Sequence, residues 1–548
     1  MKTHQKKKTA FPWNLQSLIP ILLTAILIFA AFIRLTELAT LPSTLNRDEA
    51  ALAYNAYLLE KTGKDEWGRS WPVSLESFGD YKLPGYPMLL VAFFKVFGAN
   101  DFAVRLPSAL AGTLLVAVGY FFARRVLNLH PISCLIVAVT LALQPVFFFY
   151  SRMAWEANVA LLFFATAVTL FFSLTQDKGN RQKLDIIALL LCLLAIFTYN
   201  TPLLLLPFVA LALVIDRGVR QWRGWLLPFA GTLVIFAAGL FLFSSISQQK
   251  SGITVFSDET LWQQSVDYRN SFSGIAQKVL GNRYVFFGKV ILQNYWKSFS
   301  PEFLIQKGGG HPWHNVPNIG HLFIATYLLA LVGIGRLVWV MLAPKTNHAS
   351  RLTALTLLFL LLTSLIPSVI TVDSPHATRS LFFFFLLCTF SGVAIEWMWK
   401  LVSIESDYRY PLQVFFVLLF LFGIGNELHR YYFAYFSAYP KQSAEILKAG
   451  LGTQVQKMEE RLGSSPDQVA IVDPDGFLYT EVAWDLKIPP EEFFSTINHH
   501  LPDRIGLKYG YRVGRYRFIV NRNDRVPEDT HLIEWDPYTN RWITDQNL

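Results

Sequence analysis

The sequence predicts an all-α polytopic membrane protein with about eleven transmembrane helices and a small C-terminal α/β domain. Two observations carry this fold class. Hydrophobic residues make up 53% of the 548 residues and charged residues only 16%, a balance that soluble domains of this length do not show. Apolar runs of about 18 residues or more recur along the chain. Each such run can cross a bilayer core of about 30 Å.

The basic residues set the orientation of these spans. The N-terminus "MKTHQKKKTA" is basic, and the run from Leu15 to Leu38 is too long for a signal-peptide core. We therefore expect an uncleaved first span with the N-terminus in the cytoplasm. Because Lys and Arg gather in alternate loops, the net charge of +9 indicates topology rather than nucleic-acid binding. The further spans are expected at 103–123, 131–149, 157–175, 184–200, 202–215, 224–245, 319–342, 352–370, 380–399 and 411–428.

This topology divides the chain into a transmembrane domain, 1–428, and a C-terminal domain, 429–548, which an odd number of spans places outside the cytoplasm. Two more long segments, 40–102 and 246–318, face the same side. The short runs "QVAIVD" and "YRFIV" accompany a helical stretch within 429–548, which is typical of a small α/β domain. We expect a multi-pass protein of the plasma (inner) membrane.

The stretch "LNRDEAALAYNAYLLEKTG" places two carboxylates just after the first span. Asn46 is suited to cap a helix, with Glu49 as its capping-box partner, and Gly63 ends that helix. A purely structural role for both carboxylates is therefore one alternative. Capping accounts for Glu49 better than for Asp48, however, which makes Asp48 the candidate functional group.

Charged residues also stand at the start of the other outer segments. Asp80 and Lys82 precede Pro84, which can open a second apolar helix that ends at Gly98. Arg105 then enters the second span. We expect both helices of the 40–102 loop to lie on the membrane surface, each with charged groups at its start.

Two short outer turns repeat this pattern. In "YSRMAWEANVAL", Arg152 and Glu156 are four residues apart, so that on a helix they can form an ordinary interfacial ion pair. In "TVDSPHATRSLFFFF", His376 and Arg379 precede a Phe-rich span. The outer turns therefore direct carboxylates and cations toward one surface.

Such a surface suits glycosyl transfer from a lipid-linked sugar. A carboxylate can take a proton from an acceptor hydroxyl, and cations can hold the phosphate of the leaving group. On this interpretation Lys82, Arg379, His376 and Arg152 bind the donor phosphate, and Glu49, Asp80 and Arg105 support the site. A polymerase or ligase that uses polyprenyl-diphosphate donors, and a non-enzymatic lipid-sugar flippase or transporter, remain alternatives.

The motifs "RDEA" after the first span, "KLP" before the second interfacial helix and "FAVRLPSALAG" at the next span resemble the membrane-embedded GT-C glycosyltransferases. The resemblance is closest to glycosyltransferase family 39-like proteins, which include protein O-mannosyltransferases and bacterial aminoarabinose transferases. It is most specific over residues 15–200, and "SPEFL…GGGHPWHNVPNIG" and "DSPHATRS" are similar to segments of bacterial members.

The resemblance implies a GT-C fold, an inverting reaction and roles for individual residues. It implies that Asp48 is the catalytic base and that Lys82 contacts the donor phosphate. Glu156 would orient the acceptor or bind a metal, and Arg105 would be structural. The implied partners are a polyprenyl-phosphate-linked sugar, an extracytoplasmic acceptor (protein, lipid or glycan) and membrane lipid, with no nucleic acid.

One position departs from the resemblance. Aminoarabinose-type members often carry "EKP", with Glu directly before the lysine, whereas here Tyr81 fills that place and Asp80 lies one residue earlier. This departure argues against a metal site of that kind. His311 and His314 are the remaining weak candidates for a divalent metal, and no other cofactor is expected.

Overall fold

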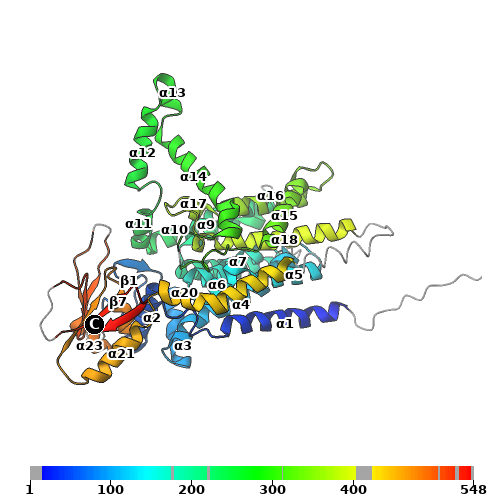
Figure 1. Cartoon of the computed structure of the whole chain (residues 1–548). Coiled ribbons are helices and arrows are strands. Elements are labelled where there is room, and N and C mark those ends of the chain that lie inside the picture. The colour runs from blue at the N-terminus through cyan, green and yellow to red at the C-terminus, as the bar shows by residue number, and fades with distance from the viewer. Residues whose placement is uncertain are drawn as a thin grey trace, which may run out of the picture.

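The protein, a computed structural model, is described over residues 15–173, 178–218, 222–311, 313–402, 423–503, 506–524 and 530–544. Long apolar helices run along one common direction, and a compact sheet domain lies at one end of them (Figure 1). The helices that correspond to the expected spans are α1 (Leu15–Leu35), α4 (Asp101–Arg125), α5 (Pro131–Leu143), α6 (Pro145–Ser151), α7 (Glu156–Phe172), α8 (Lys178–Thr198), α9 (Thr201–Arg217), α10 (Trp222–Leu242), α15 (Ile324–Leu342), α16 (His348–Thr363), α17 (Ile366–Val369) and α18 (Leu381–Val402).

The expected number of eleven spans is not confirmed. Within the described residues, six helices are long and apolar enough to cross a membrane, or seven if the bent pair α5–α6 counts as one span. The helices α7 and α9 have 17 residues each, and α8 begins with the polar stretch "KGNRQKLD". The last expected span, 411–428, lies largely outside the described residues.

A proline bends one of the expected spans. The run expected at 131–149 bends by 55° between α5 and α6, where Gln144 adopts an extended conformation directly before Pro145. A residue that precedes proline is driven out of the helical region by steric contact with the ring, which explains the break. The run expected at 352–370 forms α16 and α17, which are separated by a two-residue turn at 364–365 and together make one candidate span, His348–Val369.

The outer segments fold into short elements between the long helices. The first loop contains α2 (Arg47–Thr62), the antiparallel pair β1 (Leu75–Ser77) and β2 (Asp80–Lys82), and α3 (Gly85–Phe97). The second contains α11 (Ser244–Ser251), α12 (Glu259–Asn270), α13 (Gly274–Val279), α14 (Arg283–Phe299) and the π-helix η2 (Glu302–Gln306). The 3-10 helix η3 (Thr378–Ser380) leads into α18.

The small C-terminal sheet domain is present as expected. Its six strands have the order β4-β5-β6-β3-β7-β8. The runs "QVAIVD" and "YRFIV" form the central strands β3 and β6, which pair in parallel. The π-helix η4 (Ala434–Ala438) and α20 (Tyr439–Ile446) lead into this domain. Its own elements are α21 (Leu451–Leu462), β3 (Gln468–Val472), α22 (Leu478–Asp485), α23 (Pro490–Thr496), β4 (Asn498–His499), β5 (Gly510–Val513), β6 (Tyr516–Ile519), β7 (Thr530–Asp536) and β8 (Arg541–Thr544).

The sheet domain is seated directly on the first outer loop. Residues of α2 and α3 share one hydrophobic core with β3, α22 and α23. Tyr54 donates to the carbonyl of Ile488 at 2.9 Å, and Trp484 donates to Asp101 at 2.8 Å. The helix that carries "RDEA" is therefore held between the transmembrane helices and the C-terminal domain. The aromatic residues Tyr431, Tyr435 and Tyr439 pack in the core of the transmembrane helices, beyond the domain boundary expected at 428.

Candidate active site

The local structure of "NRDEA" follows from its capping residues. The side chain of Asn46 accepts hydrogen bonds from the backbone N–H groups of Asp48 and Glu49. The Glu49 carboxylate in turn accepts one from the backbone N–H of Asn46, so the predicted capping box is present. Gly63 ends the helix in the left-handed conformation, as expected. On this first turn the two carboxylates point into different surroundings.

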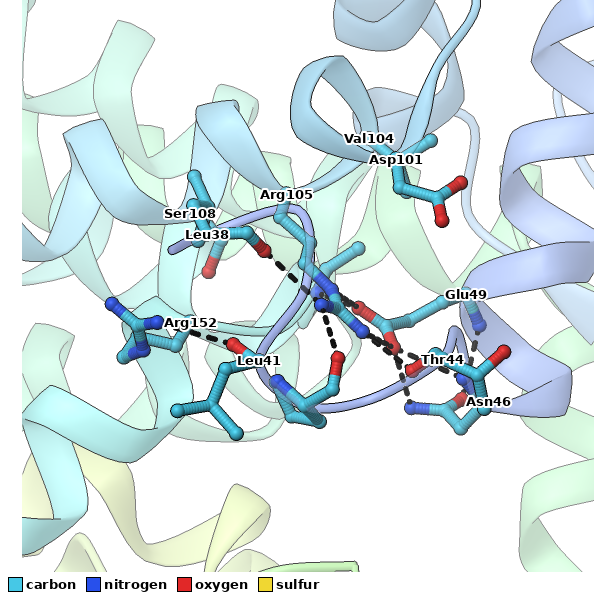
Figure 2. A network of polar contacts seen from close by, with 12 residues as sticks. Leu38, Leu41, Thr44, Asn46, Glu49, Asp101, Val104, Arg105, Ser108 and Arg152 are labelled. Atoms are coloured by element: carbon cyan, nitrogen blue, oxygen red, sulfur yellow. Dashed lines mark hydrogen bonds and ion pairs between the residues drawn. The ribbon is translucent and has the colours of Figure 1, made fainter. Parts of the chain in front are cut away.

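Glu49 lies in a buried polar network, where Arg105 is its main partner (Figure 2). Arg105 Nε is 3.1 Å from Glu49 Oε1, and the same oxygen accepts from the backbone of Ala154 at 2.7 Å. The remaining donors of Arg105 reach the carbonyls of Leu38, Pro42 and Thr44. Both side chains thus hold the link between α1 and α2 in place.

Arg152 does not take the position that the sequence predicted for it. It is buried, and its guanidinium donates to Tyr435 Oη at 2.9 Å and to backbone carbonyls at the end of α1 and in the following turn. It lies in a turn before α7 rather than on that helix, so it forms no ion pair with Glu156. With its donors committed, Arg152 fixes α1 against the bundle instead of binding a phosphate.

Asp48 faces a polar cavity of about 340 Å³ instead. Several outer segments with charged residues converge on this cavity. It is lined by the first loop, the start of α7, α11, residues 311, 313 and 314, and the turn before α18. Its charged and histidine lining residues are Arg47, Asp48, Asp80, Lys82, Glu156, Lys250, His311, His314, Asp373, His376 and Arg379.

Lys82 is the central cation of this cavity. It lies on the short strand β2, before the second interfacial helix rather than within it, and its Nζ is 2.7 Å from Asp48 Oδ1 and 3.2 Å from Asp80 Oδ2. Burial alone would lower the pKa of Lys82, but Asp48, Asp80 and Glu156 outweigh it and raise that pKa, so Lys82 stays charged. Burial likewise opposes ionisation of Asp80, yet Lys82 and Lys250 lower its pKa to about 2.

Glu156 is the first residue of α7 and immediately precedes the span expected at 157–175. Burial raises the pKa of its carboxyl to about 7, and the nearby charge of Lys82 only partly opposes this shift. A carboxyl group with a pKa near neutrality is suited to exchange protons or to change charge at physiological pH. Asp48 and Glu156 therefore line the same cavity, but in different ionic surroundings.

Another part of the cavity wall comes from the turn before α18. Arg379 forms an ion pair with Asp373 and donates to Thr371 Oγ1 at 2.7 Å. His376 lies 3.5 Å from Asp373 and 2.7 Å from Thr378 Oγ1. Burial and the charge of Arg379 lower the pKa of His376 to about 4, so the imidazole is neutral at pH 7. It can therefore act as a hydrogen-bond partner but not as a cation.

His311 and His314 reach the same cavity but do not complete a metal site. The ring centroid of His314 lies 5.0 Å from that of His311 and 4.7 Å from that of His376. Tyr150 Oη lies 3.0 Å from His314 Nδ1. Among the described residues, no group of three or more His, Cys, Asp or Glu side chains is arranged to hold a metal ion. These rings form an aromatic and hydrogen-bonding part of the cavity wall.

Lys250, whose Nζ is 2.8 Å from Asp80 Oδ1, was not predicted from the sequence as a site residue. The preceding residue, Gln249, bonds to the backbone of Gly79 and Tyr81 at 2.7 and 3.0 Å and so ties α11 to β2. One signal was available in the sequence. Lys250 follows the expected span 224–245 directly on the outer side, where a basic residue close to a span goes against the positive-inside rule.

A second, mostly apolar cavity of about 240 Å³ adjoins the polar one. The two share Leu83, Asn200, Ile246 and Lys250 as lining residues. The apolar cavity continues between α9, α10 and α11 along Leu203, Leu204, Leu240 and Phe243. A polar chamber that opens into an apolar channel matches a ligand with a charged head and a hydrocarbon tail.

Comparisons with known proteins agree with this arrangement. A family model described as dolichyl-phosphate-mannose-protein mannosyltransferase matches residues 82–245. No curated protein matches the chain. ArnT from Cupriavidus metallidurans, solved bound to undecaprenyl phosphate, is similar with 14% identity and a TM-score of 0.51 over 87% of this chain and 86% of that one.

The archaeal oligosaccharyltransferase AglB from Archaeoglobus fulgidus, solved with an inhibitory peptide and a dolichol-phosphate, is similar with 12% identity and a TM-score of 0.50. The match covers 85% of this chain and 64% of AglB, so this chain spans less than two thirds of that protein. The structural likenesses show a shared fold. Together with the family-model match over residues 82–245, they confirm the resemblance to GT-C, family 39-like membrane glycosyltransferases.

Proposed function

We propose that this protein is an inverting glycosyltransferase that moves a monosaccharide from a polyprenyl-phosphate donor to an acceptor outside the cytoplasm. The observation that carries the proposal is the contact between Asp48 and Lys82 in a polar cavity that opens into an apolar one. A base, a phosphate-binding cation and a path for a lipid tail then meet at one place. The match to the mannosyltransferase family model and the GT-C fold support the same class.

The ion pairs of the cavity suggest how the donor would prepare the site. In the described structure Lys82 pairs with Asp48 and Asp80, Lys250 with Asp80, and Arg379 with Asp373. A phosphate that enters the cavity competes for these cations. As it draws Lys82 away, one lone pair of Asp48 becomes available to an acceptor hydroxyl, so donor binding would activate the base.

The transfer is then a single displacement. The acceptor oxygen attacks the anomeric carbon while its proton passes to Asp48, and the bond between that carbon and the phosphate oxygen breaks. The electron pair of the broken bond stays on the phosphate, where Lys82, Lys250 and Arg379 stabilise the growing charge. Attack from the face opposite the leaving group inverts the anomeric configuration. Glu156 would orient the acceptor.

The test uses the purified full-length protein in lipid nanodiscs with radiolabelled polyprenyl-phosphate sugars. Transfer to an acceptor extract, or slow release of free sugar in its absence, supports the proposal. Movement of intact lipid across liposomes without bond cleavage would instead identify a flippase. Cleavage of polyprenyl-diphosphate donors but not of monophosphate donors would identify the polymerase or ligase alternative.

A further inference from the structure

The helices α12, α13 and α14 form an arm, defined here as Glu259–Phe299, that projects from the bundle across the direction of the long helices (Figure 1). α12 packs against α14, and Phe286 and Phe287 of α14 form a small core with Val255, which precedes the arm. This small core is a cluster distinct from the main core of the bundle, and Ile291 packs against both.

The root of the arm fixes its level along the bundle. Asn294 donates to the carbonyl of Val369 at 2.9 Å, and Tyr295 donates to that of Leu362 at 3.1 Å. Phe299 packs edge-on against Phe383, in the first turn of α18, with 5.0 Å between the ring centroids. The arm therefore leaves the bundle at the span ends that border the polar cavity. In a bilayer, the ends of spans lie at the level of the lipid headgroups.

The arm exposes large apolar side chains that this small core does not use. On α14, Val285, Leu292 and Trp296 share one face, opposite the buried face that carries Phe286 and Phe287. Ile275 near the tip is 82% exposed, and Tyr284 is 74% exposed. Contiguous exposed apolar residues of this kind mark an interaction surface, and Trp and Tyr are typical of the membrane interface.

The charge of the arm indicates what that surface meets. It carries five basic and two acidic residues, a net charge of 5 − 2 = +3. All five basic side chains are exposed, and they are Arg269, Lys278, Arg283, Lys289 and Lys297. Basic residues beside an exposed apolar face are typical of helices that lie on anionic lipid.

We propose that the arm docks on the outer surface of the bilayer, where its basic residues bind anionic phospholipid headgroups and its apolar face enters the acyl boundary. Its base is joined to the wall of the cavity. The backbone N–H of Val255 donates to the Ile370 carbonyl at 2.9 Å. The backbone N–H of Val372, the residue directly before Asp373, donates to the Ile253 carbonyl at 3.1 Å. Docking of the arm would therefore steady the turn that holds Arg379.

The test uses the full-length protein in nanodiscs of phosphatidylcholine alone or mixed with phosphatidylglycerol. The native cysteines Cys134, Cys192 and Cys388 are buried, so a spin label can be directed to Ile275→Cys, with Tyr538→Cys on the C-terminal domain as the matched control. Tyr538 is 96% exposed. In anionic nanodiscs we expect the label at 275 to be accessible to oxygen and shielded from a water-soluble nickel complex, and the label at 538 to show the reverse.

Neutralising the arm then tests the headgroup contact. We expect the variant with Arg269→Gln, Lys278→Gln, Arg283→Gln and Lys289→Gln to lose most of this shielding, several-fold in the accessibility ratio, while the label at 538 is unchanged. Equal shielding in both lipid compositions would overturn anionic headgroups as the ligand. A label at 275 that stays in water in every bilayer would overturn the proposal and indicate a protein partner. None of these readouts depends on transferase activity.

Discussion

Asp48 and Glu49 are adjacent on one helical turn, yet they belong to two different regions of the molecule. Glu49 pairs with Arg105 beneath the loop, where the side chains are 2% and 0% exposed. Asp48 pairs with Lys82 above it, where they are 25% and 11% exposed and face the cavity. A carboxylate–cation pair thus occurs once in the buried interior and once at the polar cavity.

The difference shows that the partners of a carboxylate decide whether a ligand can reach it. Around Glu49, backbone and side-chain donors occupy both carboxylate oxygens, so no ligand can reach them without breaking the fold. Around Asp48, by contrast, Oδ1 contacts the Lys82 ammonium, a cation that a phosphate can attract. The buried pair should therefore control stability, whereas the cavity pair should control turnover.

The largest expected effect is on catalysis at the cavity pair. We expect Asp48→Asn to lower kcat by about 10²–10⁴-fold, because it removes a positioned general base, while the thermal unfolding temperature stays unchanged. Transfer of labelled sugar by the purified variant measures this. Asp475→Asn, on the exposed surface of the C-terminal domain, is the matched control. Wild-type turnover by Asp48→Asn would remove Asp48 from the mechanism.

The buried pair should respond in the opposite way. Arg105→Ala leaves the Glu49 carboxylate buried without its charge partner, which typically costs about 3–5 kcal/mol of folding free energy. We expect a lower unfolding temperature and yield, but near-normal kinetics in the protein that survives. Arg125→Ala, exposed at the other end of the same helix, is the control. Normal stability with lost turnover would place Arg105 in the catalytic site instead.

Loss of a cavity cation should have a smaller effect on turnover than loss of the base. A charged hydrogen bond contributes about 1.5–3 kcal/mol net, so we expect Lys82→Ala and Arg379→Ala each to lower kcat/KM by roughly ten- to a hundredfold. Both should raise the donor KM and lower kcat, since the leaving phosphate gains charge in the transition state. Lys95→Ala, exposed on α3, is the control. Unchanged donor kinetics in Arg379→Ala would mean that it only anchors α18.

Local signals in the sequence predicted much of this comparison. The capping box at Asn46, the proline before α3 and the charged outer turns are read from neighbouring residues, and the structure contains them. The pairing of Glu49 with Arg105, 56 positions apart, was not predicted, because sequence spacing does not show which helices pack together.

Arg152 is a case in which sequence spacing predicted a pair that the structure does not contain. Its spacing from Glu156 predicted a helical pair, but the chain turns between them and directs Arg152 toward the carbonyls at the end of α1. Those carbonyls have no partner within their own helix, and a buried arginine can satisfy several at once. Lys250 was missed because its partner, Asp80, lies 170 positions away.

The smallest expected effect is a pH dependence that belongs to Glu156. Burial raises the pKa of its carboxyl to about 7, so it is mostly neutral at pH 6 and mostly ionised at pH 8. If the ionised form orients the acceptor, kcat should rise by about tenfold or less across this interval, because the ionised fraction rises by that amount. Asp80, with a pKa of about 2, and His376, with a pKa of about 4, do not titrate in the same window. The phosphodiester of the donor is ionised throughout.

We therefore expect Glu156→Gln to remove the inflection near pH 7 and to leave a flat profile at the low-pH level. Glu491→Gln, exposed on the C-terminal domain, should keep the wild-type profile. Initial rates of transfer at saturating donor, measured from pH 5.5 to 8.5 in steps of about half a unit, provide the comparison. An inflection that persists in Glu156→Gln would assign the titration to another group, and the cavity would then contain only one carboxylate, Asp48, whose ionisation the reaction uses.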